Sequence, residues 1–272
     1  MSVDLPELEL ARPSPSTVVR SDAAGVRWYR AAHLAESTPH QYPSVTSILA
    51  ATMPADRKAK LEAWRANDPA AAERIMVHAR DRGTVMHRMC EAKLFGRTAD
   101  VAGFPEEVVI HAARCFESLA EVLAGIRWFS AVELPFLEPE NRYAGTIDLV
   151  ASFEEGTLDV VDWKTAEGWK DPDWVHDYRL QVAAYAAAWN LEEAKQPERI
   201  AVYSVSDWPP ARPGSTSVIP GRAPYVKRAR IVIANLYREA QVIVMGRDEL
   251  LARWVEFRAR LATFWALQAP AA

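Results

Sequence analysis

Two carboxylates and a lysine interrupt a stretch of the chain that otherwise has the composition of apolar strands. Asp148 lies inside YAGTIDLVASF, and Asp162 and Lys164 are two apart in TLDVVDWKT. Side chains two apart on a strand point to one face, so Asp162 and Lys164 should project together. The short EEG turn between the runs predicts antiparallel neighbours, which would bring Asp148 to the same face.

Such a group suits a hard divalent cation. Two close carboxylates repel each other, and a cation such as Mg²⁺ removes that repulsion. Lys164 could then hold a water or stabilise charge on a phosphoryl oxygen. Taken alone, the D-x-K tripeptide is more often a buried Asp–Lys salt bridge, so its context must decide.

Two helical segments add polar pairs with a spacing of four residues. His87 and Glu91 occur in RGTVMHRMCEAKLFG, and Gln181 and Tyr185 occur in YRLQVAAYAAAW. Each pair lies on one helix face. Alone, a single helical His is more often structural, and the Ala-rich helix is more often a packing surface.

Taken in order, these features form four motifs: GxxxH (Gly83 to His87), GxxD (Gly145 to Asp148), DxKT (Asp162 to Thr165) and QxxxY (Gln181 to Tyr185). In this order they resemble the RecB-like branch of the PD-(D/E)XK nuclease superfamily, which includes phage-type exonucleases and CRISPR-associated nucleases. The resemblance covers roughly residues 42–190 and includes YPSVTSIL followed by LEAW. It implies an α/β fold, with a restriction-endonuclease-like core of a central mixed β-sheet flanked by helices.

The resemblance also implies a role for each motif residue. The metal ligands would be His87, Asp148, Asp162 and the main-chain carbonyl of Trp163. Lys164 would orient the attacking water, and Gln181 and Tyr185 would contact phosphates of the cleaved strand. Lesser candidates, for a second metal or for holding Lys164, are Glu91 and Glu133. The metal would be Mg²⁺ or Mn²⁺.

The chain departs from the family pattern in three ways. Ile147 replaces the proline of the PD motif, which the chemistry does not require. The cysteine cluster that holds an iron–sulfur cluster in several RecB-like members is missing, and the two cysteines, Cys90 and Cys115, are expected to be buried small hydrophobic residues. A GxxxxGK[ST] phosphate loop is also missing, so no nucleotide cofactor is expected, and a helicase, recombinase or annealing protein would be a separate partner.

The remaining elements follow from periodicity and turn residues. We expect an N-terminal arm over 1–41 with one strand at 26–31, and a single nuclease domain over 42–272. That domain divides into a helical part (42–125), a catalytic core (126–206) and C-terminal strands and helix (207–272). The first expected helix begins after Ser44 or Thr46, and further helices are expected at 56–66, 69–95, 105–124, 173–195 and 248–267. Strands are expected at 128–137, 143–153, 157–165 and 199–205, and a loop at 206–224. Residues 227–245 fit either a hairpin or a strand followed by a helix.

Charge argues against a protein that coats nucleic acid through bulk attraction, because the formal net charge is −4. Local contacts with DNA remain open. Expected contributors are Lys164, Arg179, Lys170 and the basic cluster Lys227, Arg228 and Arg230, with Trp169, Trp163 and Trp174 as base-stacking platforms or core residues. The basic cluster fits a solvated strand edge equally well. No apolar run has the length of a membrane span, so we expect a cytoplasmic protein.

These observations predict a metal-dependent DNA nuclease, with an exonuclease favoured over an endonuclease by analogy, using metal-activated water. A catalytically inactive binding or assembly subunit with the same fold is the alternative, although it should have lost a ligand or the lysine. A metal hydrolase acting on another substrate would more typically use several His ligands, and His40, His78, His111 and His176 show no HxH or HxxxH grouping. Strandedness, polarity and oligomeric state stay open.

Overall fold

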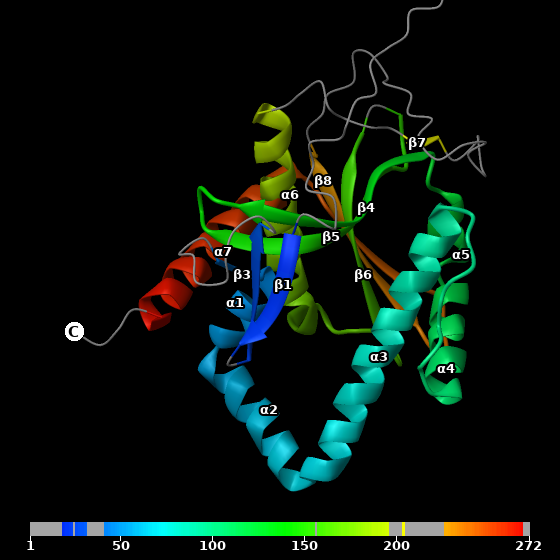
Figure 1. The fold of residues 1–272 in the computed structure, drawn as a ribbon, viewed down its shortest axis with the longest axis horizontal. Coiled ribbons are helices and arrows are strands. Elements are labelled where there is room, and N and C mark those ends of the chain that lie inside the picture. Colours follow the sequence, from blue (N-terminus) through cyan, green and yellow to red (C-terminus); the bar gives the residue numbers. More distant parts are fainter. Residues whose placement is uncertain are drawn as a thin grey trace, which may run out of the picture.

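A mixed sheet forms the centre of the protein. The computed structural model describes residues 18–23, 25–31, 41–155, 157–195, 203–204 and 226–268 (Figure 1). Within these residues, six strands have the order β7-β4-β5-β6-β8-β9. They are β4 (Trp128–Glu138), β5 (Tyr143–Ser152), β6 (Asp159–Ala166), β7 (Tyr203–Ser204), β8 (Arg228–Asn235) and β9 (Gln241–Met245). The β6–β8 pair is parallel and the other neighbouring pairs are antiparallel, so the predicted mixed sheet is confirmed.

The two strands after the long loop form a hairpin, which resolves the choice that the sequence left open. The Asn235 side-chain amide donates hydrogen bonds to the carbonyls of Ile233 and Glu239, both at 3.1 Å. These bonds hold the turn between β8 and β9. A short polar side chain that bonds to nearby backbone favours such a turn over a helix.

The helices agree largely with the predicted ranges. They are α1 (Val45–Ala51), α2 (Ala55–Asn67), α3 (Pro69–Leu94), α4 (Glu106–Glu117), α5 (Ala120–Ala124), the short 3₁₀ helix η2 (Pro172–Val175), α6 (His176–Lys195) and α7 (Arg247–Gln268). Ser44 caps α1 by accepting from the backbone N–H of Ser47 at 3.0 Å, and Asp68 caps α3. Because Asp68 and Pro69 end α2 and start α3, the two helices diverge in a V (Figure 1).

The single helix expected over 105–124 is two helices, α4 and α5. The break occurs at Ser118, whose hydroxyl donates to the Cys115 carbonyl at 2.7 Å and accepts from the backbone N–H of Asn235 at 3.0 Å. The second bond joins the helix end to β8, a contact that local periodicity could not predict.

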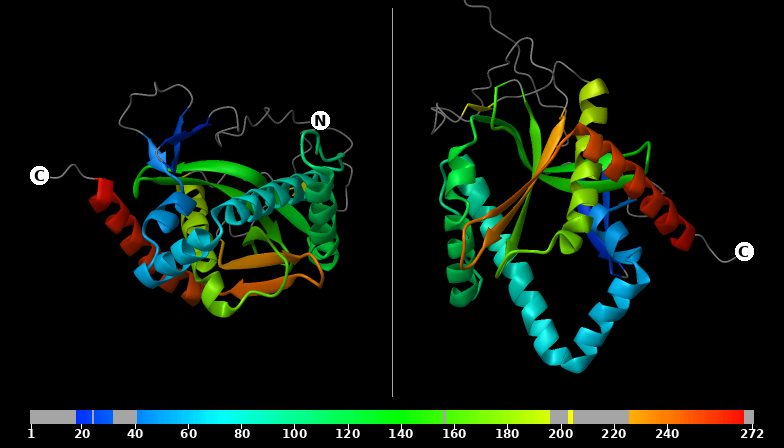
Figure 2. Two further views of the ribbon diagram at one scale, coloured as in Figure 1. Left: turned by 90° about the horizontal axis from the view of Figure 1, so that it is seen from below. Right: turned by 180° about the vertical axis from the view of Figure 1, so that it is seen from behind.

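Apolar clusters cover both faces of the sheet. One cluster joins it to α3 and α4 and contains Cys90 and Cys115, both buried as predicted. The other joins it to α1, α6 and α7. The views in Figure 2 show these helices on opposite sides of the strands, so the core has three layers.

The N-terminal segment is a small sheet docked on this core. The predicted strand at 26–31 is β2 (Val26–Ala31), but it pairs with β1 (Val18–Ala23) and with β3 (Tyr42–Pro43). Trp28 of β2 packs against the rings of Phe264 and Trp265 on α7. This segment is therefore attached to the core and is not a free extended arm.

Part of the prediction lies outside the described residues. Of the strand expected at 199–205, only residues 203–204 are described, and they form β7. The loop expected at 206–224 and His40 fall in ranges that are not described. The predicted domain boundary at 41/42 stays a prediction.

Candidate active site

The strands β5 and β6 separate at the two predicted aspartates. Their pairing ends at Leu149 and Val161, and continuing this antiparallel register places Asp148 opposite Asp162. Instead of a ladder bond at this level, the Trp163 amide donates to Asp148 Oδ2 at 2.8 Å. The carboxylate of Asp148 thus bridges the two strands where they part.

Glu133 continues this row on the third strand. It lies between the pairs Val132–Leu149 and Leu134–Ile147, so Asp148 is its neighbour across β4 and β5. Its φ of 45° is in the left-handed region, which costs a residue with a side chain about 1–3 kcal/mol. Three adjacent strands therefore each supply one carboxylate, from Glu133, Asp148 and Asp162.

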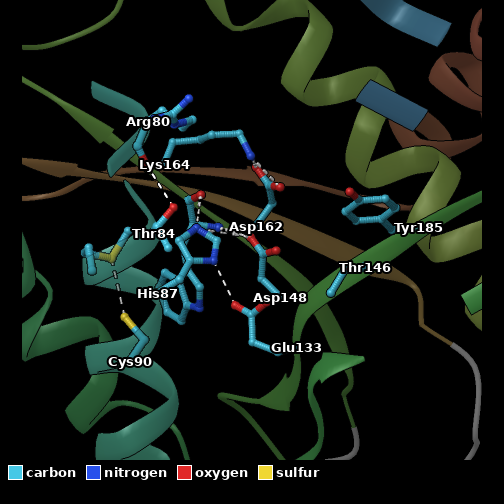
Figure 3. A network of polar contacts seen from close by, with 12 residues as sticks. Arg80, Thr84, His87, Cys90, Glu133, Thr146, Asp148, Asp162, Lys164 and Tyr185 are labelled. Atoms are coloured by element: carbon cyan, nitrogen blue, oxygen red, sulfur yellow. Dashed lines mark hydrogen bonds and ion pairs between the residues drawn. The ribbon is translucent and has the colours of Figure 1, made fainter. Parts of the chain in front are cut away.

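His87 reaches this row from α3 (Figure 3). Its Nδ1 lies 2.8 Å from Glu133 Oε1, and its Nε2 lies 3.1 Å from the Trp163 carbonyl oxygen and 3.9 Å from Asp148 Oδ2. One donor atom each of His87, Glu133 and Asp148 lies within 4.8 Å of the others. An imidazole and two carboxylates this close form a set that can hold a metal ion.

Lys164 and Gln181 hold the third carboxylate. The Lys164 ammonium lies 2.6 Å from Asp162 Oδ1, which also accepts from the Gln181 amide at 2.8 Å. Gln181 further donates to the Tyr185 hydroxyl at 2.9 Å. The ammonium is 2.5 Å from Asp162 Oδ2 but outside hydrogen-bonding geometry, so Oδ2 accepts no hydrogen bond from the part of the chain that the structure describes. The Asp–Lys salt bridge weighed above is present, inside a larger polar cluster.

The glycine of the GxxD motif allows two aromatic rings to approach the strand. A Cβ atom on Gly145 would lie 2.9 Å from ring carbons of both Phe136 and Tyr185. Since Cβ atoms do not approach other carbons so closely, a larger residue at this position would force the rings or the strand to shift.

The buried charges shift one another's protonation. Burial by itself lowers the pKa of His87, but Asp148 and Glu133 outweigh it and raise that pKa to about 9. Burial raises the pKa of Asp162 to about 6, against the opposing effect of Lys164. Burial lowers the pKa of Lys164, but Asp162 and Asp148 bring it above its ordinary value, so the side chain stays an ammonium at neutral pH.

A cavity of about 650 Å³ opens onto this cluster. His87, Glu133, Asp148, Lys164, Gln181, Tyr185 and Glu91 all line it. Arg20 and Arg27 of the β1–β2 hairpin and Arg80 and Arg88 of α3 add positive charge to its wall. The wall thus combines four arginines and Lys164 with the carboxylates of Glu91, Glu133 and Asp148, and Asp22 forms ion pairs with Arg20 and Arg27 as Asp81 does with Arg80.

The sources of that charge differ from the expected ones, apart from Lys164. Arg228 and Arg230 are held by the buried carboxylate of Asp159, with nitrogen–oxygen distances of 2.9 and 2.5 Å. Arg179 forms an ion pair with Glu249 of α7. These arginines are ion-paired inside the protein because each lies beside a carboxylate that needs a partner, which residue type alone does not reveal.

Three of the other predicted contacts to DNA, Lys170, Trp169 and Trp174, lie away from the cavity wall. Lys170 and Trp169 are described residues, and neither lines the cavity. Trp169 and Trp174 are 58% and 61% exposed, which leaves both rings open to a ligand, whereas Trp163 is 1% exposed and packs in the core. Glu133, expected to hold Lys164 or a second metal, contacts His87 and belongs to the group with His87 and Asp148 that can hold a metal ion, so its expected role stays a prediction.

Sequence reasoning missed the arginines of the wall. Arg80 and Thr84 lie seven and three residues before His87, and Glu91 lies four after it, so they share its face of α3, and Arg88, four residues after Thr84, borders that face. That helical spacing was the available signal for Arg80 and Arg88. The hairpin arginines offered none, because their position depends on docking of a segment far away in the sequence.

Comparison with known proteins gives concordant matches. Residues 55–256 match the family model described as the PD-(D/E)XK nuclease superfamily. Mitochondrial genome maintenance exonuclease 1 of Mus musculus is 30% identical over 159 residues, which cover 54% of this chain and 44% of that protein. The Xenopus tropicalis protein of the same name is 28% identical over 172 residues, covering 58% and 45%. The chain thus matches less than half the length of these relatives.

Proposed function

The chain belongs to the PD-(D/E)XK nuclease superfamily, and we propose that it is a divalent-metal-dependent DNA nuclease that works from strand ends. One observation carries the proposal: Glu133, Asp148 and Asp162 form a row across three strands, with His87 and Lys164 beside it. The arrangement suits hydrolysis of a phosphodiester, in which negative charge gathers on phosphoryl oxygens.

The residues present fit a Mg²⁺ or Mn²⁺ ion. Carboxylate and carbonyl oxygens suit these cations, and one donor atom each of His87, Glu133 and Asp148 lies within 4.8 Å of the others. The ion would be held by His87, Asp148, Asp162 and the main-chain carbonyl of Trp163. When bound, it activates a water for attack and withdraws charge from the phosphoryl oxygen.

Glu133 has a separate task in this scheme. It contacts Nδ1 of His87, whereas Nε2 points toward the Trp163 carbonyl and Asp148. A carboxylate on the far nitrogen of a ligating histidine fixes the ring's orientation and raises its basicity. Glu133 is therefore a positioning residue for His87, and Glu91, on the same cavity wall, is the candidate ligand for a second ion.

Lys164 acts as a cation in this proposal and not as a base, because its pKa lies above the ordinary value. Its ammonium can hold the attacking water and stabilise the developing phosphoryl charge. Gln181 fixes the Asp162 carboxylate. The Tyr185 hydroxyl accepts from Gln181 and can donate its own hydrogen to a phosphate oxygen.

The arginines of the cavity wall support DNA as the substrate. Guanidinium groups match phosphate oxygens, and contacts to phosphates bind nucleic acid without regard to sequence. Arg20 and Arg27 come from the hairpin and Arg80 and Arg88 from α3, so a strand in the cavity would meet positive charge from two elements.

The names of the relatives and the sequence motifs bear on three further parts of the proposal: action at strand ends, the partners and the location. Both relatives are named exonucleases, which favours end-dependent cleavage here. A separate helicase, recombinase or annealing protein stays the proposed partner class. Among the described residues, no helix has the length and apolarity to cross a membrane. The cytoplasm stays the proposed location, although the relatives' names refer to mitochondria.

The test uses end-labelled linear DNA and closed circular DNA, each single- and double-stranded, with Mg²⁺, Mn²⁺ or EDTA. The proposal predicts that linear DNA is shortened, that circles survive and that EDTA stops the reaction. Circles cut as fast as linear DNA would refute the requirement for ends. Normal DNA binding without cleavage in either metal would refute the nuclease and favour the inactive binding subunit.

A further inference from the structure

A second cluster of metal-binding side chains lies between α3 and α4. His111 Nδ1 is 3.3 Å from His78 Nε2, and the two rings meet edge to face with centroids 5.1 Å apart. One donor atom each of His78, Glu107 and His111 lies within 4.8 Å of the others. His78 precedes His87 by nine residues on α3, about 13 Å at 1.5 Å per residue, so this cluster is separate from the candidate active site.

We propose that His78, Glu107 and His111 bind a transition-metal ion such as Zn²⁺. Two imidazoles and one carboxylate are three ligands of a tetrahedral zinc site, with the fourth position left to water. Imidazole nitrogens favour zinc, nickel and copper, whereas Mg²⁺ prefers oxygen ligands. The donor chemistry thus separates this site from the carboxylate-rich centre at Asp148 and Asp162.

The packing of α3 against α4 already holds the three ligands close to one another. Glu107 and His111 are four apart on α4, so both side chains lie on one face of that helix. His78 faces them from α3, and the two helices are packed through Val85, Val108 and other members of one apolar cluster. An ion here needs little rearrangement of the backbone.

The site is also open to an ion from solution. Glu107 is exposed, and both histidines are partly buried. In the metal-free protein, the facing ring nitrogens must share one hydrogen, which makes an ordinary hydrogen bond. A bound ion would replace that hydrogen and join α3 to α4, and α3 carries both His87 and Arg80 of the cavity.

The test uses the whole 272-residue chain after its metal ions have been removed with EDTA. Zinc binding is measured by calorimetry and by the change in melting temperature when Zn²⁺ is added as the single metal ion. Asp148→Asn weakens the candidate active site, so zinc retained by this variant reports on the second cluster. His111→Gln and Glu107→Gln each remove one ligand, and His176→Gln on α6 is the matched histidine control. Even loss of a side chain that only supports a ligand costs about 10–100-fold in metal affinity, so loss of a ligand should cost at least about 100-fold.

The proposal predicts that wild type, Asp148→Asn and His176→Gln keep a zinc ion that raises the melting temperature, and that His111→Gln and Glu107→Gln lose it. If His111→Gln does not fold, the exposed position of Glu107 keeps Glu107→Gln decisive. Zinc bound as tightly by Glu107→Gln as by His176→Gln would overturn the proposal. So would an Asp148→Asn variant that binds no zinc.

Discussion

Replacing Asp162 by Asn should stabilise the metal-free protein while removing its metal affinity. The carboxyl is fully buried, and its pKa is raised from 3.8 to about 6. Each pH unit of such a change corresponds to about 1.4 kcal/mol, so at pH 8 ionisation of Asp162 costs the metal-free fold on the order of 3 kcal/mol. Asn removes this cost and keeps an oxygen in place of Oδ1, which accepts from both Lys164 and Gln181, while its amide nitrogen replaces Oδ2 beside the Lys164 ammonium and offsets part of the gain.

Denaturant unfolding in EDTA at pH 8 measures this change, with Asp159→Asn as the matched control. Asp159 is equally buried on the same strand but is held by Arg228 and Arg230 away from the cavity. Its replacement should destabilise the fold by about 1–3 kcal/mol, because two guanidinium groups lose a charged acceptor. With Mn²⁺ added, wild type and Asp159→Asn should gain stability and Asp162→Asn should not. The reasoning is refuted if Asp162→Asn is less stable than wild type in EDTA, or gains as much from Mn²⁺.

Three further predictions concern the same site. Lys164→Ala should lower the cleavage rate about 10²–10³-fold in single-turnover assays without lowering the affinity for Mn²⁺. Lys170→Ala, a change outside the cavity, should alter neither the cleavage rate nor the Mn²⁺ affinity. Gly145→Ala should lower the free energy of unfolding by about 1–3 kcal/mol, because the added Cβ would meet two aromatic rings at 2.9 Å. Gly168→Ala is the control, because a Cβ there would meet no atom within 4 Å. Equal losses of stability in the two variants would contradict the explanation. Since the folded-state pKa of His87 is raised from 6.5 to about 9, its stabilising contribution is complete below pH 6.5 and is lost as pH rises through 9. The melting temperature in EDTA should fall over that range, and an equal fall in His87→Gln would exclude His87 as the cause.

Much of the site could be predicted because its residues follow local periodicity. Strand parity placed Asp162 and Lys164 on one face, and they form an ion pair. Helical spacing placed Gln181 beside Tyr185, and they share a hydrogen bond. These contacts span two or four residues, so the geometry of a single strand or helix determines them.

The remaining features depend on contacts between distant segments. Glu133 meets His87, 46 residues away in the sequence, from a position of positive φ within β4 that no residue pattern shows. His78 and His111 are 33 residues apart and meet only because two helices pack. The docking of the β1–β2 hairpin, which brings Arg20 to the cavity, likewise depends on tertiary packing.

The central claim is that the centre formed by His87, Asp148 and Asp162 hydrolyses DNA. The most direct test compares wild type and Asp162→Asn for both binding and cleavage of one end-labelled DNA in Mn²⁺. The account predicts that the two proteins bind the DNA with similar affinity, that wild type cleaves it until EDTA is added, and that Asp162→Asn leaves it intact. Undiminished cleavage by Asp162→Asn would place the chemistry elsewhere in the chain.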